Sequence, residues 1–127
     1  MELYNKYDKR ILKQKLMEED FKRITISFYR YVIIDEPEVL RDELYAEWAE
    51  LNVFGRTYLA KEGVNAQMSV PEHNWEEFML RLQARKMFEN MPIKKAVEDD
   101  GKSFYKLIVK VRKKIVADGL ADGTFDV

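Results

Sequence analysis

Apolar residues recur along this chain at two spacings, and the spacing changes from one expected element to the next. Over residues 3–19 the apolar positions lie at helical spacing with charged residues on the other face, which predicts an amphipathic helix. Residues 24–34 alternate instead and are rich in β-branched and aromatic side chains, which predicts a strand. A second helix is expected to begin at Pro37, because the missing N–H of proline costs nothing in a first turn. Its buried stripe is predicted to contain Leu40, Leu44, Trp48 and Leu51.

The pattern after the second helix predicts a hairpin. Residues 54–60 and 64–70 are strand-like, and the turn between them ends in Gly63, which tolerates the positive φ of a tight connection. The remaining expected elements are a helix that opens at Pro71, with Trp75, Phe78, Met79 and Leu82 as its buried stripe, and strands over residues 93–97 and 104–111.

The order after the first helix is therefore strand, helix, strand, strand, helix, strand, strand. This order predicts an α+β fold of the ferredoxin-like, acylphosphatase-like βαββαβ type, with an antiparallel sheet, helices on one face, and an additional N-terminal helix. We expect the N-terminal helix within residues 1–21, the ferredoxin-like domain over residues 22–116, and a linker over residues 117–127.

Composition narrows the chemistry that this chain can perform. Its 127 residues are enough for one domain, and the absence of cysteine excludes disulfides, zinc knuckles and a cysteine nucleophile within these residues. The single histidine has no imidazole partner, and the acids at 98–100 before a glycine are typical of a solvated turn, so no metal site is predicted. The charged N-terminus and the lack of a long apolar run predict a soluble intracellular domain without membrane contact.

The loop expected after the first strand argues against acylphosphatase activity. An enzyme of that type holds phosphate in a glycine-containing loop, whereas residues 35–38 are Asp-Glu-Pro-Glu and contain no glycine. Acidic side chains there would repel a phosphate in spite of the favourable helix dipole.

Charge is distributed unevenly, although the net charge is only -1. Residues 35–50 contain seven acids and one base, and residues 102–116 contain six bases and no acid. One interpretation is a basic, aromatic surface that binds an RNA backbone and stacks its bases. The other is a solvated edge strand, whose lysines block pairing with another sheet.

Four sequence blocks carry a resemblance to a known family. They are residues 26–31 (ISFYRY), 53–67 (VFGRTYLAKEGVNAQ), 101–107 (GKSFYKL) and 109–119 (VKVRKKIVADG). In this order they resemble the N-terminal domain of the rhodanese-related tRNA uridine hydroxylases, over about residues 22–120.

The resemblance implies a bacterial, cytoplasmic tRNA-modifying enzyme that hydroxylates the wobble uridine to 5-hydroxyuridine. In that family an acylphosphatase-like domain precedes a rhodanese domain that carries the catalytic cysteine, so residues 117–127 would lead toward that second domain. Because this chain contains no cysteine, we expect it to bind tRNA rather than to catalyse the reaction by itself. Its implied partners are tRNA and the rhodanese domain of the same full-length chain, and no cofactor is expected in this domain.

Eight residues are the predicted RNA contacts. Arg30 and Arg56 are expected to bind phosphate or bases, because the planar guanidinium pairs with phosphate through two hydrogen bonds. The other predicted contacts are Lys61, Asn65 and Gln67 near the hairpin, and Lys110, Arg112 and Lys113 in the basic segment. For Arg30 a structural ion pair with the acidic helix is the alternative. For the whole domain the alternative is a protein-interaction module that docks a rhodanese sulfurtransferase domain without RNA contact.

Overall fold

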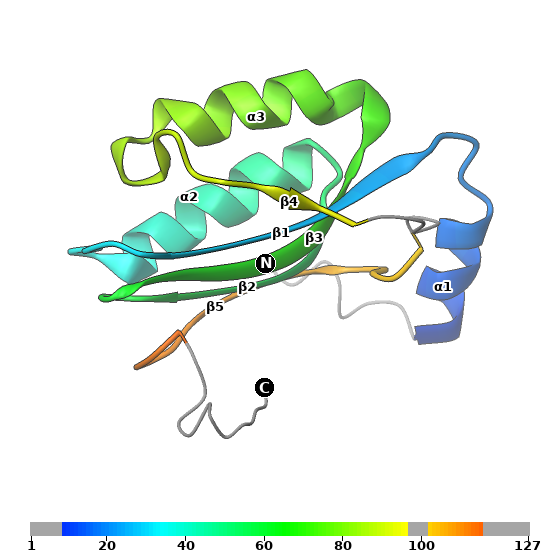
Figure 1. Cartoon of the computed structure of the whole chain (residues 1–127). Coiled ribbons are helices and arrows are strands. Elements are labelled where there is room, and N and C mark those ends of the chain that lie inside the picture. Colours follow the sequence, from blue (N-terminus) through cyan, green and yellow to red (C-terminus); the bar gives the residue numbers. More distant parts are fainter. Residues whose placement is uncertain (1–8, 97–101, 116–127) are drawn as a thin grey trace.

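The computed structural model describes residues 9–96 and 102–115 of the chain (Figure 1). In chain order its elements are α1 (Lys9–Met17), β1 (Arg23–Tyr31), α2 (Pro37–Glu50), β2 (Phe54–Ala60), β3 (Gly63–Pro71), the 3-10 helix η2 (Glu72–Asn74), α3 (Trp75–Ala84), the 3-10 helix η3 (Lys86–Phe88), β4 (Lys94–Lys95) and β5 (Leu107–Val111).

The strands form one five-stranded sheet in the order β4-β1-β3-β2-β5. The first four strands pair antiparallel, and this part has the expected ferredoxin-like arrangement. β5 pairs with β2 in parallel, so the sheet is mixed rather than wholly antiparallel as predicted. The reason is that β5 runs opposite to β4 and returns to the far edge of the sheet, where its direction matches that of β2.

Helices α2 and α3 cover one face of the sheet, and α1 lies beyond the end at which β1 begins (Figure 1). Alternate strand residues point toward α2 and α3, and the predicted stripe of α2 is buried against them, with Leu44 and Trp48 fully inaccessible. The fully buried large side chains of this layer are Trp48, Phe78, Phe88, Ile26, Leu44, Leu59, Met68, Leu82, Val53, Val64, Val70 and Val109. The predicted α+β fold with helices on one face is therefore confirmed.

Several boundaries differ from the expected ones. β1 ends at Tyr31 rather than at residue 34, although the N–H groups of Val32 and Ile34 still donate to the hairpin turn at 2.9 Å. Pro71 closes β3, and the helix after it starts at Trp75 once the 3-10 turn is complete. β4 is reduced to the two residues that pair with β1. Residues 3–8 of the expected first helix, the acidic turn at 98–100 and the expected linker at 117–127 lie outside the described residues.

Two negative findings concern the described residues alone. None of their helices has the length and apolarity needed to span a bilayer. They also contain no group of three or more His, Cys, Asp or Glu side chains placed to hold a metal ion.

Candidate nucleic-acid interface

The sheet face opposite α2 and α3 carries the candidate site, and we call it the open face. Because strand residues alternate between the two faces, the strand register places its side chains in rows. One row runs across four strands through Tyr29, Asn65, Tyr58 and Lys110. The neighbouring row contains Lys94, Ser27, Gln67, Arg56 and Ile108.

Two tyrosines of β1 are exposed at one side of the open face. Tyr29 is 46% and Tyr31 62% accessible, and their rings meet edge to face with centroids 5.4 Å apart. Burial, a side-chain hydrogen bond with Tyr31, the charge of the ionised Tyr31 hydroxyl and the nearby Glu62 carboxylate together raise the pKa of Tyr29 from 10.0 to about 12. Both hydroxyls therefore belong to one polar cluster at the end of β1.

The other side of the open face combines aromatic rings with guanidinium groups. The Arg112 guanidinium carbon lies 4.0 Å from the centroid of the Tyr58 ring, which is the geometry of a cation–π contact. The Arg56 guanidinium carbon lies 5.9 Å from the ring centroid of Phe104. Arg56, Lys110 and Arg112 are all exposed, so their charges face solvent.

The segment after β5 folds back over the end of the open face. The Ile115 N–H donates to Glu62 Oε2 at 3.0 Å, and the Asn65 side-chain amide donates to the Ile115 carbonyl at 3.1 Å. The Ile115 side chain is buried against Gly63, where an added Cβ would lie 3.0 Å from its Cδ1. Ile115 therefore separates the tyrosines of β1 from the Tyr58–Arg112 pair at this end of the sheet.

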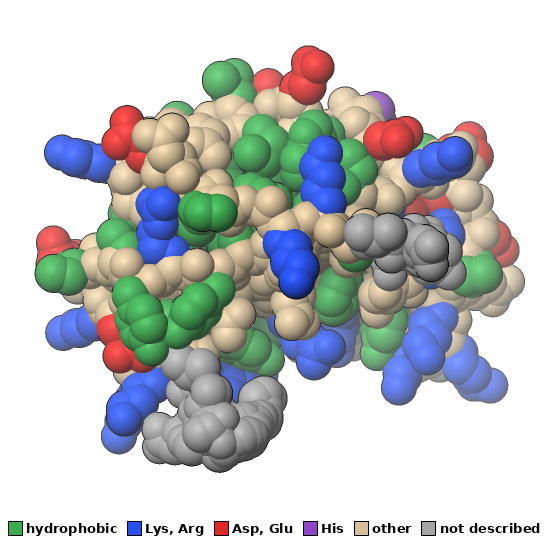
Figure 2. Space-filling model, in the orientation of Figure 1, with side chains coloured by type: hydrophobic (Ala, Val, Ile, Leu, Met, Phe, Trp, Pro, Cys, Tyr) green, Lys and Arg blue, Asp and Glu red, His purple; other side chains and the backbone are tan. Residues whose placement is uncertain are grey.

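Charge on the open face is positive. The rows through β1, β2, β3, β4 and β5 contain Arg56, Lys94 and Lys110 and, among the described strand residues, no acid. Figure 2 shows Lys and Arg side chains along the lower border of the molecule, below the sheet and below α1, and others over its front, while most Asp and Glu side chains lie away from the lower border. A surface of this kind attracts polyanions.

The structure brings five of the predicted contact residues together on the open face. They are Arg56, Asn65, Gln67, Lys110 and Arg112. Gln67 is exposed in the centre of its row, whereas the amide group of Asn65 is already engaged by Ile115. Lys61 and Lys113 lie at the rim, where they line a groove described below.

Arg30 lies on the opposite face of the sheet from the other predicted contacts. It has the same orientation along β1 as Ile26 and Phe28, and its guanidinium NH1 group donates to the carbonyl oxygens of Met87 at 3.2 Å and Glu89 at 3.0 Å. These bonds attach β1 to the turn after α3. The expected alternative, an ion pair with the acidic helix, is not the contact that Arg30 makes.

The acidic helix is instead paired with α3 and the residue after it. Arg85 contacts Glu43 at 2.9 Å and Glu47 at 3.1 Å, and Arg81 contacts Glu50 at 3.1 Å. These ion pairs hold the two helices side by side and neutralise part of the acidic charge of α2.

A groove lies at the start of α2, at the rim of the sheet. It is lined by Asp35, Glu36, Pro37, Glu38, Val39, Lys61, Val111, Arg112 and Lys113. The exposed side chain of Ile33 precedes the groove by two residues, and Val39 within it is also exposed. The groove therefore combines charges of both signs with accessible apolar surface.

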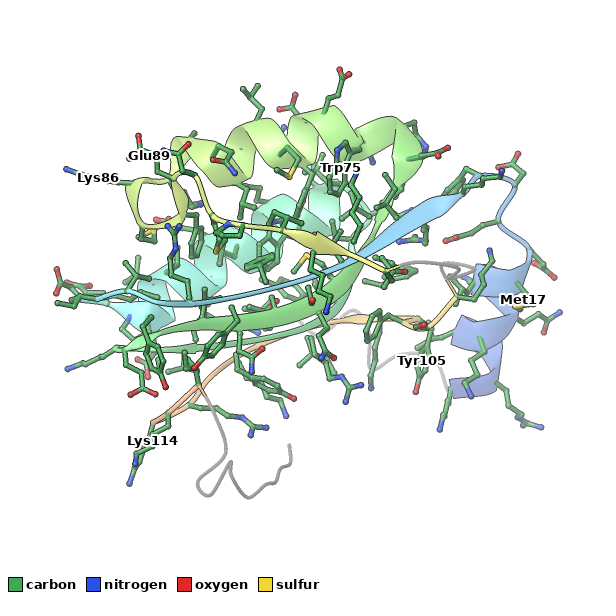
Figure 3. All side chains as sticks on the ribbon, viewed as in Figure 1. Met17, Trp75, Lys86, Glu89, Tyr105 and Lys114 are labelled. Carbon is green, nitrogen blue, oxygen red and sulfur yellow. The ribbon has the colours of Figure 1, made fainter. Side chains whose placement is uncertain are left out.

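Two open-face residues, Tyr58 and Lys94, were not predicted from the sequence. Tyr58 lies two positions after Arg56 in the same strand, so the alternation of that strand was sufficient to place it on the same face. Lys94 could be placed only through its pairing with Ser27, because β4 is too short to show a period. Its neighbour Lys95 points to the other face, where its Nζ lies 4.9 Å from the ring centroid of Trp75, which projects from α3 toward β4 (Figure 3).

Comparison with known proteins supplies the family and the fold. A family model described as the UPF0176 acylphosphatase like domain matches residues 23–115. Over 125 residues the chain is 57% identical to a protein named tRNA uridine(34) hydroxylase from Leptospira interrogans, and 45% identical to one of the same name from Hamiltonella defensa. Both alignments cover 98% of this chain, but only 34% and 35% of the relatives. The chain thus spans about a third of the length of the curated relatives that it matches.

A solved structure with a similar backbone is BlrB, a BLUF protein in its dark state. It superposes with a TM-score of 0.50 at 9% sequence identity, covering 71% of this chain and 74% of that chain. At this identity the likeness concerns the fold alone.

Proposed function

This chain belongs to the UPF0176 acylphosphatase-like domain family, and from that premise we propose that it is the tRNA-binding domain of an enzyme that hydroxylates uridine 34. Uridine 34 is the wobble position, and 5-hydroxyuridine is the proposed product. The names of the relatives support the reaction, and the length that they have beyond this chain leaves room for a catalytic domain. We assign the chemistry to a rhodanese domain in that further length, because this chain has no cysteine.

The observation that carries the proposal is the composition of the open face. Arg56, Lys110 and Arg112 present positive charge on a face that also carries the half-buried Tyr58 ring and the exposed rings of Tyr29 and Tyr31. The described strand residues of this face contribute no acid. Phosphate contacts need such cations, and bases need aromatic or guanidinium planes on which to stack. We propose a cytoplasmic location for the protein, where its tRNA substrate is found.

A salt titration of tRNA binding tests this function. We expect the 127-residue chain to bind a tRNA transcript at low salt, with an affinity that falls linearly on a logarithmic salt scale. The double variant Arg56→Ala and Arg112→Ala should bind more weakly and reduce the slope by roughly 1.5, since each phosphate contact contributes about 0.7 to 0.9. The matched control is Lys9→Ala with Lys86→Ala, which removes two exposed charges elsewhere.

Two results would contradict the proposed function. One is the absence of binding even at low salt. The other is an equal loss of affinity in the test and control variants, because it would mean that net charge rather than the open face governs binding.

A second candidate function is supported by the groove at the start of α2. Ile33 is 80% and Val39 51% accessible, and acids and bases line the groove together with Val39, as at an interface between domains. We propose that this end docks the rhodanese domain. Binding between this chain and the separately produced remaining two-thirds of the Leptospira relative tests it. Ile33→Asp with Val39→Asp should abolish that binding without changing the affinity for tRNA.

A further inference from the structure

We propose that the open face binds unpaired nucleotides, by stacking bases on Tyr31 and on the Arg112–Tyr58 pair. This inference rests on the proposed function and adds the form of RNA that the surface accepts. It distinguishes a single-stranded loop, whose bases are available for stacking, from a duplex that offers mainly phosphates and 2′-hydroxyls.

The first stacking position is the Tyr31 ring. It is 62% accessible, and its edge-to-face contact with Tyr29 fixes its orientation without enclosing it. An aromatic side chain exposed to this extent in a strand that otherwise packs well leaves apolar area in water. A base stacked on the ring would cover that area, whatever its identity, because every base has a π face.

The second stacking position is the pair of Arg112 and Tyr58. The guanidinium carbon lies 4.0 Å from the ring centroid, so Tyr58 holds the Arg112 side chain in a defined place. Arg112 itself is exposed, so its side chain is accessible to a ligand. Guanidinium planes stack on bases as well as on aromatic rings.

Ile115 lies between these positions at the end of the sheet, and the rows of the open face beside it suit an extended strand. Tyr29 and Tyr58 occupy one row with a single strand between them, so their backbones are roughly 10 Å apart at the usual strand spacing. The adjoining row offers the exposed amide of Gln67 between Ser27 and Arg56. Lys94 and Lys110, at opposite edges of these rows, are placed to contact phosphates on either side.

The charge of the surface favours RNA over a protein as its ligand. Exposed tyrosine and arginine side chains are also frequent in protein interfaces. A protein partner would have to place carboxylates opposite Arg56, Lys94 and Lys110, whereas an RNA strand supplies a phosphate for each nucleotide. Ordinary surfaces intersperse the two signs of charge, whereas the described strand residues of the open face are positive only. Glu62, the acid beside them in the turn before β3, accepts the Ile115 N–H.

Fluorescence anisotropy with a labelled oligouridylate of about eight nucleotides tests the inference, because such a strand fits the usual span of a single-strand binding surface and forms little structure of its own. We expect the 127-residue chain to prefer it to an RNA duplex with the same number of phosphates. Tyr31→Leu and Arg112→Lys should each weaken binding by roughly 10-fold, and Lys86→Ala should not. Arg112→Lys is decisive, because lysine keeps the positive charge but lacks the planar guanidinium group on which a base could stack.

Each result separates this inference from the proposed function. If the chain binds the tRNA transcript but prefers the duplex, or if Arg112→Lys and Tyr31→Leu bind oligouridylate as tightly as the unchanged chain, stacking is wrong and tRNA binding stands. If no RNA binds at low salt, both proposals are wrong. Equal thermal stability of the variants and the unchanged chain confirms that any loss of affinity arises at the surface.

Discussion

Arg23 and Glu19 form a two-pronged ion pair at the start of β1, with Nε–Oε1 and Nη2–Oε2 distances of 2.8 Å. The Arg23 side chain is only 1% and that of Glu19 12% accessible. The same guanidinium donates to the carbonyl of Asn52 at 2.9 Å and lies 4.1 Å from the ring centroid of Phe54. Arg23 therefore joins the residues after α1 to the start of β2.

Removing the acid of this pair should destabilise the fold. Glu19→Gln leaves the buried Arg23 charge without its carboxylate, and breaking a buried pair typically costs about 3–5 kcal/mol. We expect a loss of about 3 kcal/mol in the free energy of unfolding, because the carbonyl of Asn52 still accepts from the guanidinium. Urea denaturation measures it. Asp20→Asn, at the exposed neighbouring position, is the control, and an equal effect there would contradict a specific role for Glu19.

Gly55→Ala should be strongly destabilising for a steric reason. Gly55 has φ +143, and a Cβ at this position would lie 2.3 Å from the Gln67 carbonyl oxygen and 2.4 Å from Met68 Cα. Both are backbone atoms of the paired strand, so neither can move without disturbing β3. We expect a loss of about 3 kcal/mol in thermal or urea unfolding. The control is Ser27→Ala in β1, and a change in stability no larger than that of the control would show that the hairpin can shift.

Much of the fold could be predicted because its elements are amphipathic. The stripe of α2 and the alternate apolar residues of β3 identify the buried faces directly, and Leu40, Leu44, Trp48 and Val64, Ala66, Met68, Val70 are buried as predicted. Ser69, on the other face of β3, is buried as well. The parallel pairing of β5 could not be predicted from such a pattern. A period of two assigns faces to a strand, but it does not name the neighbouring strand or its direction.

The site was predictable to the extent that it follows from the same alternation. Arg56 and Gln67 share a row because β2 and β3 form the predicted hairpin and pair with these two residues opposite each other. Arg30 was grouped with them for its charge, although its orientation in β1 is that of the buried Phe28. The use of the Asn65 amide by Ile115 depends on residues far apart in the sequence, and no local pattern contains that contact.

Thr57→Val should stabilise the protein. Thr57 is fully buried on the helix-covered side of β2, and its hydroxyl oxygen has no hydrogen-bond partner among the described residues. Replacing the hydroxyl by a methyl group of similar size removes the desolvation cost of an unpaired polar group, so we expect a gain of about 1 kcal/mol in the free energy of unfolding. Thr57→Ser is the control, since it keeps the hydroxyl and loses the methyl, and it should destabilise. A loss of stability in Thr57→Val would show that the hydroxyl is paired.

Tyr29→Phe should change how tyrosine ionisation and the stability of the fold depend on pH in the alkaline range. The pKa of Tyr29 is raised from 10.0 to about 12 in the folded state by burial and by its neighbours Tyr31 and Glu62. Between these pH values the folded state holds a proton that the unfolded state has lost, so this contribution to stability is present below pH 10 and disappears as the pH rises toward 12. Absorbance titration at alkaline pH should show one late-ionising tyrosine that is absent from Tyr29→Phe. A late component that persists in the variant would assign it to another tyrosine.

Arg30→Lys and Arg56→Ala should separate folding from binding. The Arg30 guanidinium donates to three carbonyl oxygens of the turn after α3, and lysine cannot reproduce its fork, so we expect a stability loss of about 1–2 kcal/mol with unchanged affinity for tRNA. Arg56 is exposed on the open face, and its removal should weaken tRNA binding with little effect on the unfolding midpoint. Thermal unfolding and anisotropy on the same samples measure both properties. The affinities are compared at temperatures where both variants are folded. If Arg30→Lys then loses as much affinity as Arg56→Ala, the RNA contacts both faces of the sheet, and the assignment of the site to the open face is wrong.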